Sequence, residues 1–138
     1  WRELLLLVVL GIFPGMHITQ LTHSAENAFS QAELEKAARA ANRALPQTSP
    51  GGTTRTFKVE AAPGRTLRYH STFLSYRLSE LNVLGLMAEV TPRVQQQACT
   101  NADLIPALRA GVVVAYTYWA NDGGYIGEVR VVLSDCRR

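Results

Sequence analysis

The C-terminal part of the chain carries the pattern that most limits its fold. Val112–Trp119 is rich in β-branched and aromatic residues, which favour a strand. Tyr125–Leu133 alternates between apolar and polar side chains, with Glu128 and Arg130 on the polar side. Between these segments lies Asn121–Gly124, which reads Asn-Asp-Gly-Gly and is typical of a turn. The sequence therefore predicts a β-hairpin at the end of the chain.

A second hairpin is predicted earlier in the chain. Thr53–Glu60 alternates, and this alternation places Phe57 and Val59 on one side of a strand. Ala62–Gly64 contains Pro-Gly and predicts a turn, after which Thr66–Tyr76 alternates again. Two hairpins predict a four-stranded, mostly antiparallel sheet.

Helical segments lie before and between the hairpins. Ser30–Glu33 is a capping box, and the helix that it begins should end before Pro46. Ser79–Cys99 has apolar residues at helical spacing, although Pro92 should kink this helix or mark a restart. A short helix is predicted around Leu104–Leu108. We therefore expect an α+β fold with two or three helices packed on one face of the sheet.

The N-terminal segment is strongly apolar. Leu4–Phe13 contains no charged residue, milder residues extend this stretch to Leu21, and Arg2 precedes it. A basic start and an apolar centre are typical of a signal peptide, while the full length approaches that of a membrane-spanning helix. A buried core helix is the third reading. The first two predict an exported protein with an N-terminal apolar helix.

The positions where a signal peptidase would cut are poor. Cleavage after Ala25 would place His23 at the −3 position, and cleavage after Ala28 would place Glu26 there, where small residues are preferred. We therefore interpret residues 1–28 as a signal-anchor or signal peptide, and residues 29–138 as a single α+β domain. The expected location is the periplasm, with anchoring to the inner membrane through residues 4–21; the alternative is secretion after cleavage.

The chain has two cysteines, Cys99 and Cys136. Two cysteines do not make a zinc site by themselves, and they do not form a Cys-x-x-Cys redox pair. In an exported chain an even number of cysteines predicts a disulfide. Such a bridge would join the last strand to the helical layer and stabilise the fold by about 2–4 kcal/mol. Two separate buried thiols are the alternative if the chain is not exported.

No pattern of residues predicts catalysis, a metal site or a cofactor. The net charge of +3 is spread along the chain, whereas nucleic-acid binders usually cluster their basic residues, so we expect no nucleic-acid partner. His70 is the only imidazole after the leader, and Ser71 should point to the opposite face of the sheet. We therefore predict no catalytic residue.

An amphipathic patch of tyrosine and arginine is the sharpest binding hypothesis. It would comprise Tyr116 and Tyr118 with Arg68 or Arg130. Tyrosine and arginine are favoured at protein interfaces. The alternative is that these tyrosines are divided between the core and the sheet surface.

Several short segments together resemble a known group of proteins. They are a helix ending in Leu45-Pro46, Thr54-Arg55, Tyr69, a helix ending in Cys99, Leu104 and Leu108 before Gly111-Val112, Tyr116-Thr117-Tyr118, Ile126, and Val129 to Cys136. This combination resembles a loose family of small exported bacterial α+β proteins of unknown function, similar to quorum-sensing-regulated virulence-factor-like proteins. The resemblance implies an antiparallel sheet, supports the cysteine pairing and implies no catalytic residue.

These observations favour a non-enzymatic exported module of the bacterial cell envelope that binds another envelope protein. One alternative is a domain that binds a small ligand or performs hydrolysis with His70, Tyr69 and Arg68. Another is an accessory subunit of a larger membrane complex, which differs from the first reading mainly in stoichiometry.

Overall fold

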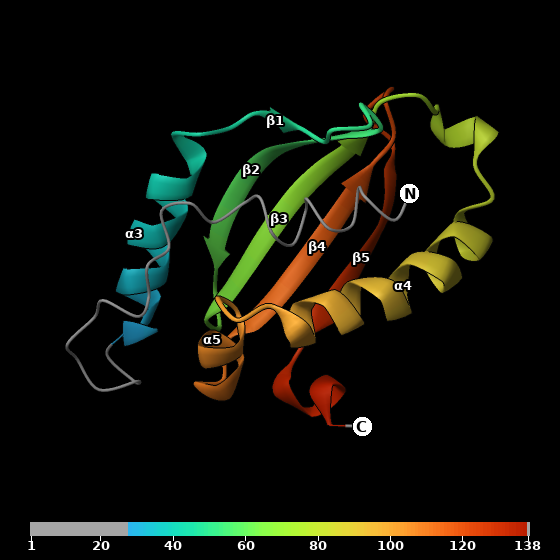
Figure 1. Ribbon diagram of the computed structural model, residues 1–138. Coiled ribbons are helices and arrows are strands. Elements are labelled where there is room, and N and C mark those ends of the chain that lie inside the picture. The colour runs from blue at the N-terminus through green and yellow to red at the C-terminus, as the bar shows by residue number, and fades with distance from the viewer. Residues whose placement is uncertain (1–27, 138) are drawn as a thin grey trace.

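The computed structural model describes residues 28–137 and contains one five-stranded sheet (Figure 1). Its strands, in their order across the sheet, are β1 (Gln47–Thr48), β2 (Thr54–Ala62), β3 (Thr66–Phe73), β4 (Val113–Trp119) and β5 (Tyr125–Val131). The antiparallel pairs β2–β3 and β4–β5 are the two predicted hairpins. The α+β class and the mostly antiparallel sheet are thus confirmed.

The predicted number of strands was wrong by one. Gln47 and Thr48 pair with β2 opposite Thr56 and Arg55, and this adds a short edge strand that the sequence does not mark by alternation. The hairpins meet through a parallel pairing of β3 with β4. Parallel neighbours need a long crossover connection, and here the chain between them forms two helices.

Helix α3 (Gln31–Asn42) packs against β2 with a face made mostly of small apolar residues. The Ser30 hydroxyl accepts a hydrogen bond from the backbone N–H of Glu33, which caps the first turn. Leu34, Ala38 and Ala41 are buried. Small residues on this face allow the helix to lie close to the sheet.

The amide side chains of α3 also bond the outer edge of β2. Asn42 Nδ2 donates to the carbonyl oxygen of Val59, and Asn42 Oδ1 accepts from the N–H of Val59, both at 2.8 Å. At the other end of the helix, Gln31 Nε2 donates to the carbonyl oxygen of Ala62 at 3.0 Å. These bonds take the place of a neighbouring strand along the part of β2 that β1 does not reach, so this part of the edge is closed.

Helix α4 (Val83–Thr100) is a single helix that passes through Pro92, so the predicted restart does not occur. The helix begins later than predicted, because Asn82 accepts a hydrogen bond from the N–H of Gly85 and caps it there. Its buried stripe comprises Leu86, Val90, Val94 and Ala98. Helix α5 (Ile105–Arg109) follows and leads into β4.

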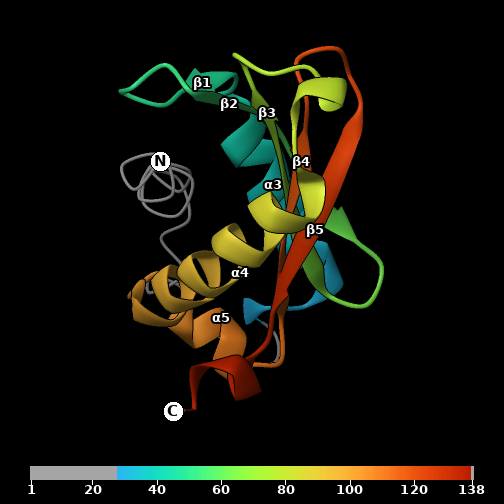
Figure 2. The same ribbon diagram turned by 90° about the vertical axis from the view of Figure 1, so that its right-hand side faces the viewer.

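The helices and the sheet form two layers, with α4 and α5 on one side of the sheet in Figure 2. Alternation within each strand therefore separates a helix-covered face from an open face. On the helix-covered face, β3 and β4 contribute the fully buried rings of Tyr69, Phe73, Tyr116 and Tyr118. The predicted N-terminal apolar helix and most of the predicted leader lie outside the described residues.

Candidate functional site

The open face of the sheet gathers aromatic side chains from four strands. The ring of His70 on β3 lies 5.8 Å from that of Phe57 on β2 and 6.2 Å from that of Trp119 on β4. The Trp119 ring in turn lies 5.4 Å from that of Tyr125 on β5. Phe57 is 44% exposed and Tyr125 is 52% exposed, so both ends of this aromatic row are accessible to solvent.

A β-bulge explains why Phe57 belongs to this row. The register between β2 and β3 shifts between Thr56 and Lys58, which places Phe57 at the irregularity. The sequence predicted that Phe57 and Val59 share one side of the strand. That prediction was wrong, because an inserted residue reverses the alternation at the bulge. Val59 is buried, while the Phe57 ring reaches His70.

Both ring nitrogens of His70 are engaged. Trp119 Nε1 donates to His70 Nδ1 at 3.2 Å, and since indole is only a donor, we assign the proton of neutral His70 to Nε2. Nε2 lies 2.7 Å from Glu60 Oε1 and donates to it. In this arrangement His70 connects β2, β3 and β4, and it leaves no free nitrogen for a substrate.

Charged side chains form a network beside the aromatic row. Glu60 lies 3.4 Å from Arg68 and 3.9 Å from Lys58. Glu128 lies 3.6 Å from Arg68 Nε and 3.2 Å from Arg130 Nη1. Two carboxylates therefore serve three cations, and this charge network carries an excess of positive charge.

The hydrogen bond from His70 is the main cause of a lowered pKa at Glu60. Arg68 and Lys58 act in the same direction, while partial burial opposes them. Glu60 therefore stays ionised below the usual range of a glutamate, which keeps its own contacts with His70, Arg68 and Lys58 in mildly acidic solution.

The tyrosines of the predicted patch are not on this face. Tyr116 and Tyr118 are 1% exposed on the helix-covered face, while Arg68 and Arg130 lie on the open face. The four residues therefore do not share one surface. The reason is the register of the parallel pair, which puts Tyr116 beside Tyr69 and gives a ring separation of 5.4 Å.

Burial raises the pKa of both of these tyrosines. Among the described residues, neither the hydroxyl of Tyr116 nor that of Tyr118 has a hydrogen-bond partner. Their rings fill the core instead, where Tyr118 lies 5.5 Å from Phe73. These side chains contribute to stability and are not available to a partner on the surface.

The residues of the predicted hydrolytic site are also divided between the two faces. Tyr69 and Ser71 are fully buried on the helix-covered face, whereas His70 and Arg68 lie on the other side of the strand. Within residues 28–137 no three His, Cys, Asp or Glu side chains are grouped so that they could hold a metal ion.

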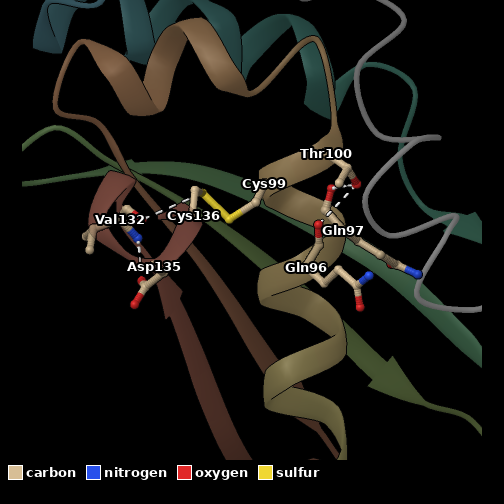
Figure 3. Close-up of a disulfide and its surroundings, with 7 residues drawn as sticks. All are labelled: Gln96, Gln97, Cys99, Thr100, Val132, Asp135 and Cys136. Atoms are coloured by element: carbon tan, nitrogen blue, oxygen red, sulfur yellow. Dashed lines mark hydrogen bonds between the residues drawn. A yellow bond between two sulfur atoms is a disulfide. The ribbon is translucent and has the colours of Figure 1, made fainter. Parts of the chain in front are cut away.

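The disulfide joins Cys99 in the last turn of α4 to Cys136 in the short 3₁₀ helix that follows β5 (Figure 3). The two Cα atoms are 5.2 Å apart, and the bridge connects the final hairpin to the helical layer as predicted. Asp135 Oδ2 accepts a hydrogen bond from the N–H of Val132 at 2.8 Å and shapes the same turn.

A cleft of about 440 Å³ lies beside this disulfide. Its lining comes from α4 and the C-terminal turn: Pro92, Gln95, Gln96, Cys99, Thr100, Asp135 and Cys136. The cleft contains one ionisable side chain, Asp135, which is engaged in the turn. It offers no pair of groups for acid–base chemistry.

The fold formed by this sheet and its covering helices is similar to that of two solved pilotins of bacterial secretion systems. The pilotin EpsS of the Vibrio vulnificus type 2 secretion system is 12% identical, with a TM-score of 0.64 over 83% of this chain and 96% of its own. The type II secretion system pilotin AspS of Vibrio cholerae is 14% identical, with a TM-score of 0.61 over 81% and 95%.

A third solved structure shares the fold. It is described as a candidate secreted protein of Pseudomonas aeruginosa and is 16% identical, with a TM-score of 0.64 over 85% of this chain and 100% of its own. No protein-family model matches the chain, and no curated protein matches it in sequence. In the part of the chain that the structure describes, none of the helices is long and apolar enough to cross a membrane.

Proposed function

We propose that this chain is a non-enzymatic, protein-binding accessory module of the bacterial envelope that acts as pilotins do. The observation that carries this proposal is an open sheet face with accessible aromatic side chains and excess positive charge, on a fold that two pilotins share. Aromatic and arginine side chains are favoured at protein interfaces. The partner would be another envelope protein, and a secretin is the first candidate.

The open face supports binding better than catalysis. Its most polar aromatic group, His70, is held on both sides by Glu60 and Trp119 and is 12% exposed as a side chain. General base catalysis needs a nitrogen within hydrogen-bond reach of the proton that it removes. Phe57 and Tyr125, in contrast, present apolar area that a partner would bury.

Co-purification with a secretin tests the proposal. The full chain and the secretin are co-expressed, and the complex is extracted with a mild detergent. We expect the wild type to retain the secretin and the double variant Phe57→Ala/Tyr125→Ala to lose most of it, because both exposed ends of the aromatic row are removed. Leu84→Ala is the matched control, since Leu84 is an 85% exposed apolar residue on α4, outside the open face.

Two results would contradict the proposal. One is a wild-type chain that retains no envelope protein, and the other is a double variant that binds as well as Leu84→Ala. The stoichiometry of the purified complex separates a transient accessory protein from a permanent subunit of a larger membrane complex.

The location of the protein belongs to the same proposal. We place the domain in the periplasm, held at the inner membrane through residues 4–21, with secretion after cleavage as the alternative. Mass spectrometry of the mature N-terminus in cells separates these locations. The finer resemblance to quorum-sensing-regulated virulence-factor-like proteins stays a prediction.

A further inference from the structure

The two outer edges of the sheet differ in their hydrogen bonding. The edge of β2 beyond β1 is bonded by the amide side chains of Gln31 and Asn42. The outer edge of β5 has no neighbouring strand, and no side chain within residues 28–137 bonds its backbone. Figure 2 views the molecule from the β5 side of the sheet. An open edge of this kind is able to pair with another chain.

The side chains of β5 indicate which chain fits. Glu128 and Arg130 occupy alternate positions and therefore point to the same, open face. They carry opposite charges and flank Val129. When two identical strands pair antiparallel about Val129, Glu128 of each copy lies opposite Arg130 of the other. The strand is thus complementary in charge to a second copy of itself.

From this complementarity we propose that the chain forms a symmetric dimer in which β5 pairs antiparallel with β5 of a second copy, in a register centred on Val129. Neighbouring registers pair the charges less favourably. A register centred on Glu128 places the two glutamates opposite each other, and one centred on Arg130 does the same with the two arginines. Like charges directly opposite each other destabilise a strand pair, so the charges select the register.

The charge network can accept this pairing without losing its existing contacts. Arg130 is half exposed as a side chain, and its present partner is Glu128 on the same strand, at 3.2 Å. Directly opposite residues have Cβ atoms about 5 Å apart, within reach of an arginine. In the dimer Glu128 lies between Arg68 of its own chain and Arg130 of the second copy, which improves the balance of charge around it.

The interface that results has two-fold symmetry, so every contact occurs twice. Two five-stranded sheets become one continuous sheet, and the two open faces lie side by side. On the helix-covered face Val129 of one copy meets Val129 of the other, while Met87 covers the gap at Gly127, where an added Cβ would lie 2.9 Å from the Met87 sulfur.

Charge inversion in the full chain tests both the dimer and its register. Sedimentation equilibrium in a mild detergent should give a wild-type protein mass of twice 15.2 kDa. Glu128→Arg places arginine opposite arginine at two equivalent points, and Arg130→Glu places glutamate opposite glutamate. We expect each variant to weaken dimerisation by at least about tenfold.

Mixing the two variants gives the sharpest result. One chain then carries two arginines and the other two glutamates, so an equimolar mixture should form the heterodimer while each variant alone stays monomeric. Glu35→Arg is the matched control, because it inverts an exposed glutamate on α3, at the opposite edge of the sheet, and should leave the dimer intact. Circular dichroism confirms that each variant is folded.

Three outcomes would overturn the inference. A monomeric wild type at hundreds of micromolar would show that this edge does not pair with itself and would leave it to a strand of a different protein. A dimer that survives Glu128→Arg and Arg130→Glu would place the interface elsewhere. A mixture that stays monomeric would exclude the register centred on Val129.

Discussion

The two faces of the sheet use the same strands for different purposes. On β3, Tyr69 enters the core while the next residue, His70, bonds Glu60 and Trp119 on the open face. The helix-covered face is filled by apolar rings, and the open face is tied together by ion pairs and hydrogen bonds. Stability and recognition are therefore separable in this molecule by changing adjacent residues.

Removing a core ring should have the largest effect on stability. Tyr116→Ala leaves a cavity at a site that is 1% exposed, so we expect the free energy of unfolding to fall by about 3–5 kcal/mol. Urea denaturation followed by circular dichroism measures this change. If Tyr116→Ala lowered the free energy of unfolding by less than an open-face variant such as Trp119→Ala does, the division between the faces would be contradicted.

Loss of the disulfide should have the next largest effect. Cys99→Ser with Cys136→Ser opens a loop that spans 37 residues, and we expect a loss of about 2–4 kcal/mol. The free energy of unfolding of the wild type, measured under reducing conditions, should match that of this double variant. If both thiols of the native, air-exposed protein react with a labelling reagent, the bridge is absent.

Trp119→Ala should cost less stability than the core change but should reach the open face directly. It removes the hydrogen bond to His70 and the ring contact with Tyr125, and we expect a loss of about 1–2 kcal/mol. Binding of the envelope partner should fall at the same time. A variant with normal binding would show that the aromatic row has only a structural role.

Acid should loosen the open face before it affects the core. The pKa of Glu60 is lowered in the folded state, so its contribution to stability is present above its unfolded value of about 4.5. That contribution is lost as the pH falls through the lower, folded value. We expect the urea concentration at the unfolding midpoint to decrease as the pH is lowered below about 4.5. In Glu60→Gln this decrease with pH should be smaller.

The smallest effect should come from removing a single oxygen atom. The hydroxyl of Tyr116 is buried and has no partner within the described residues, so Tyr116→Phe removes a polar group that gains nothing from the fold. We expect the free energy of unfolding to change by less than about 0.5 kcal/mol or to rise. A loss above about 1.5 kcal/mol would show that this oxygen has a hydrogen-bond partner.

Local signals predicted most of the elements. The capping serine at Ser30 and the glycine-rich turn before Tyr125 mark a helix start and a hairpin with short-range chemistry, and both features are present in the structure. The disulfide followed from compartment and cysteine count and is also present. Gln47–Thr48 was missed because a strand of two residues is too short to show a period.

The binding residues were harder to predict, because alternation does not say which side of a strand will be covered. Tyr116 and Arg68 were assigned to one patch, and the parallel register between β3 and β4 placed them on opposite faces. That register is set by contacts between distant segments, which leave no local pattern. Phe57 was misplaced because a bulge adds one residue to the period.

The bonds between Asn42 and Val59 also bear on how the proposed dimer could extend. A protein with two sheet edges that are free to pair can add a copy at each edge and so grow into a fibre. Helix α3 bonds the stretch of β2 beyond β1, so this stretch is not available for pairing with another strand. The dimer proposed above would therefore not extend through this stretch of β2, and Asn42→Ala would free the backbone groups of Val59 while Gln31 still bonds Ala61 and Ala62.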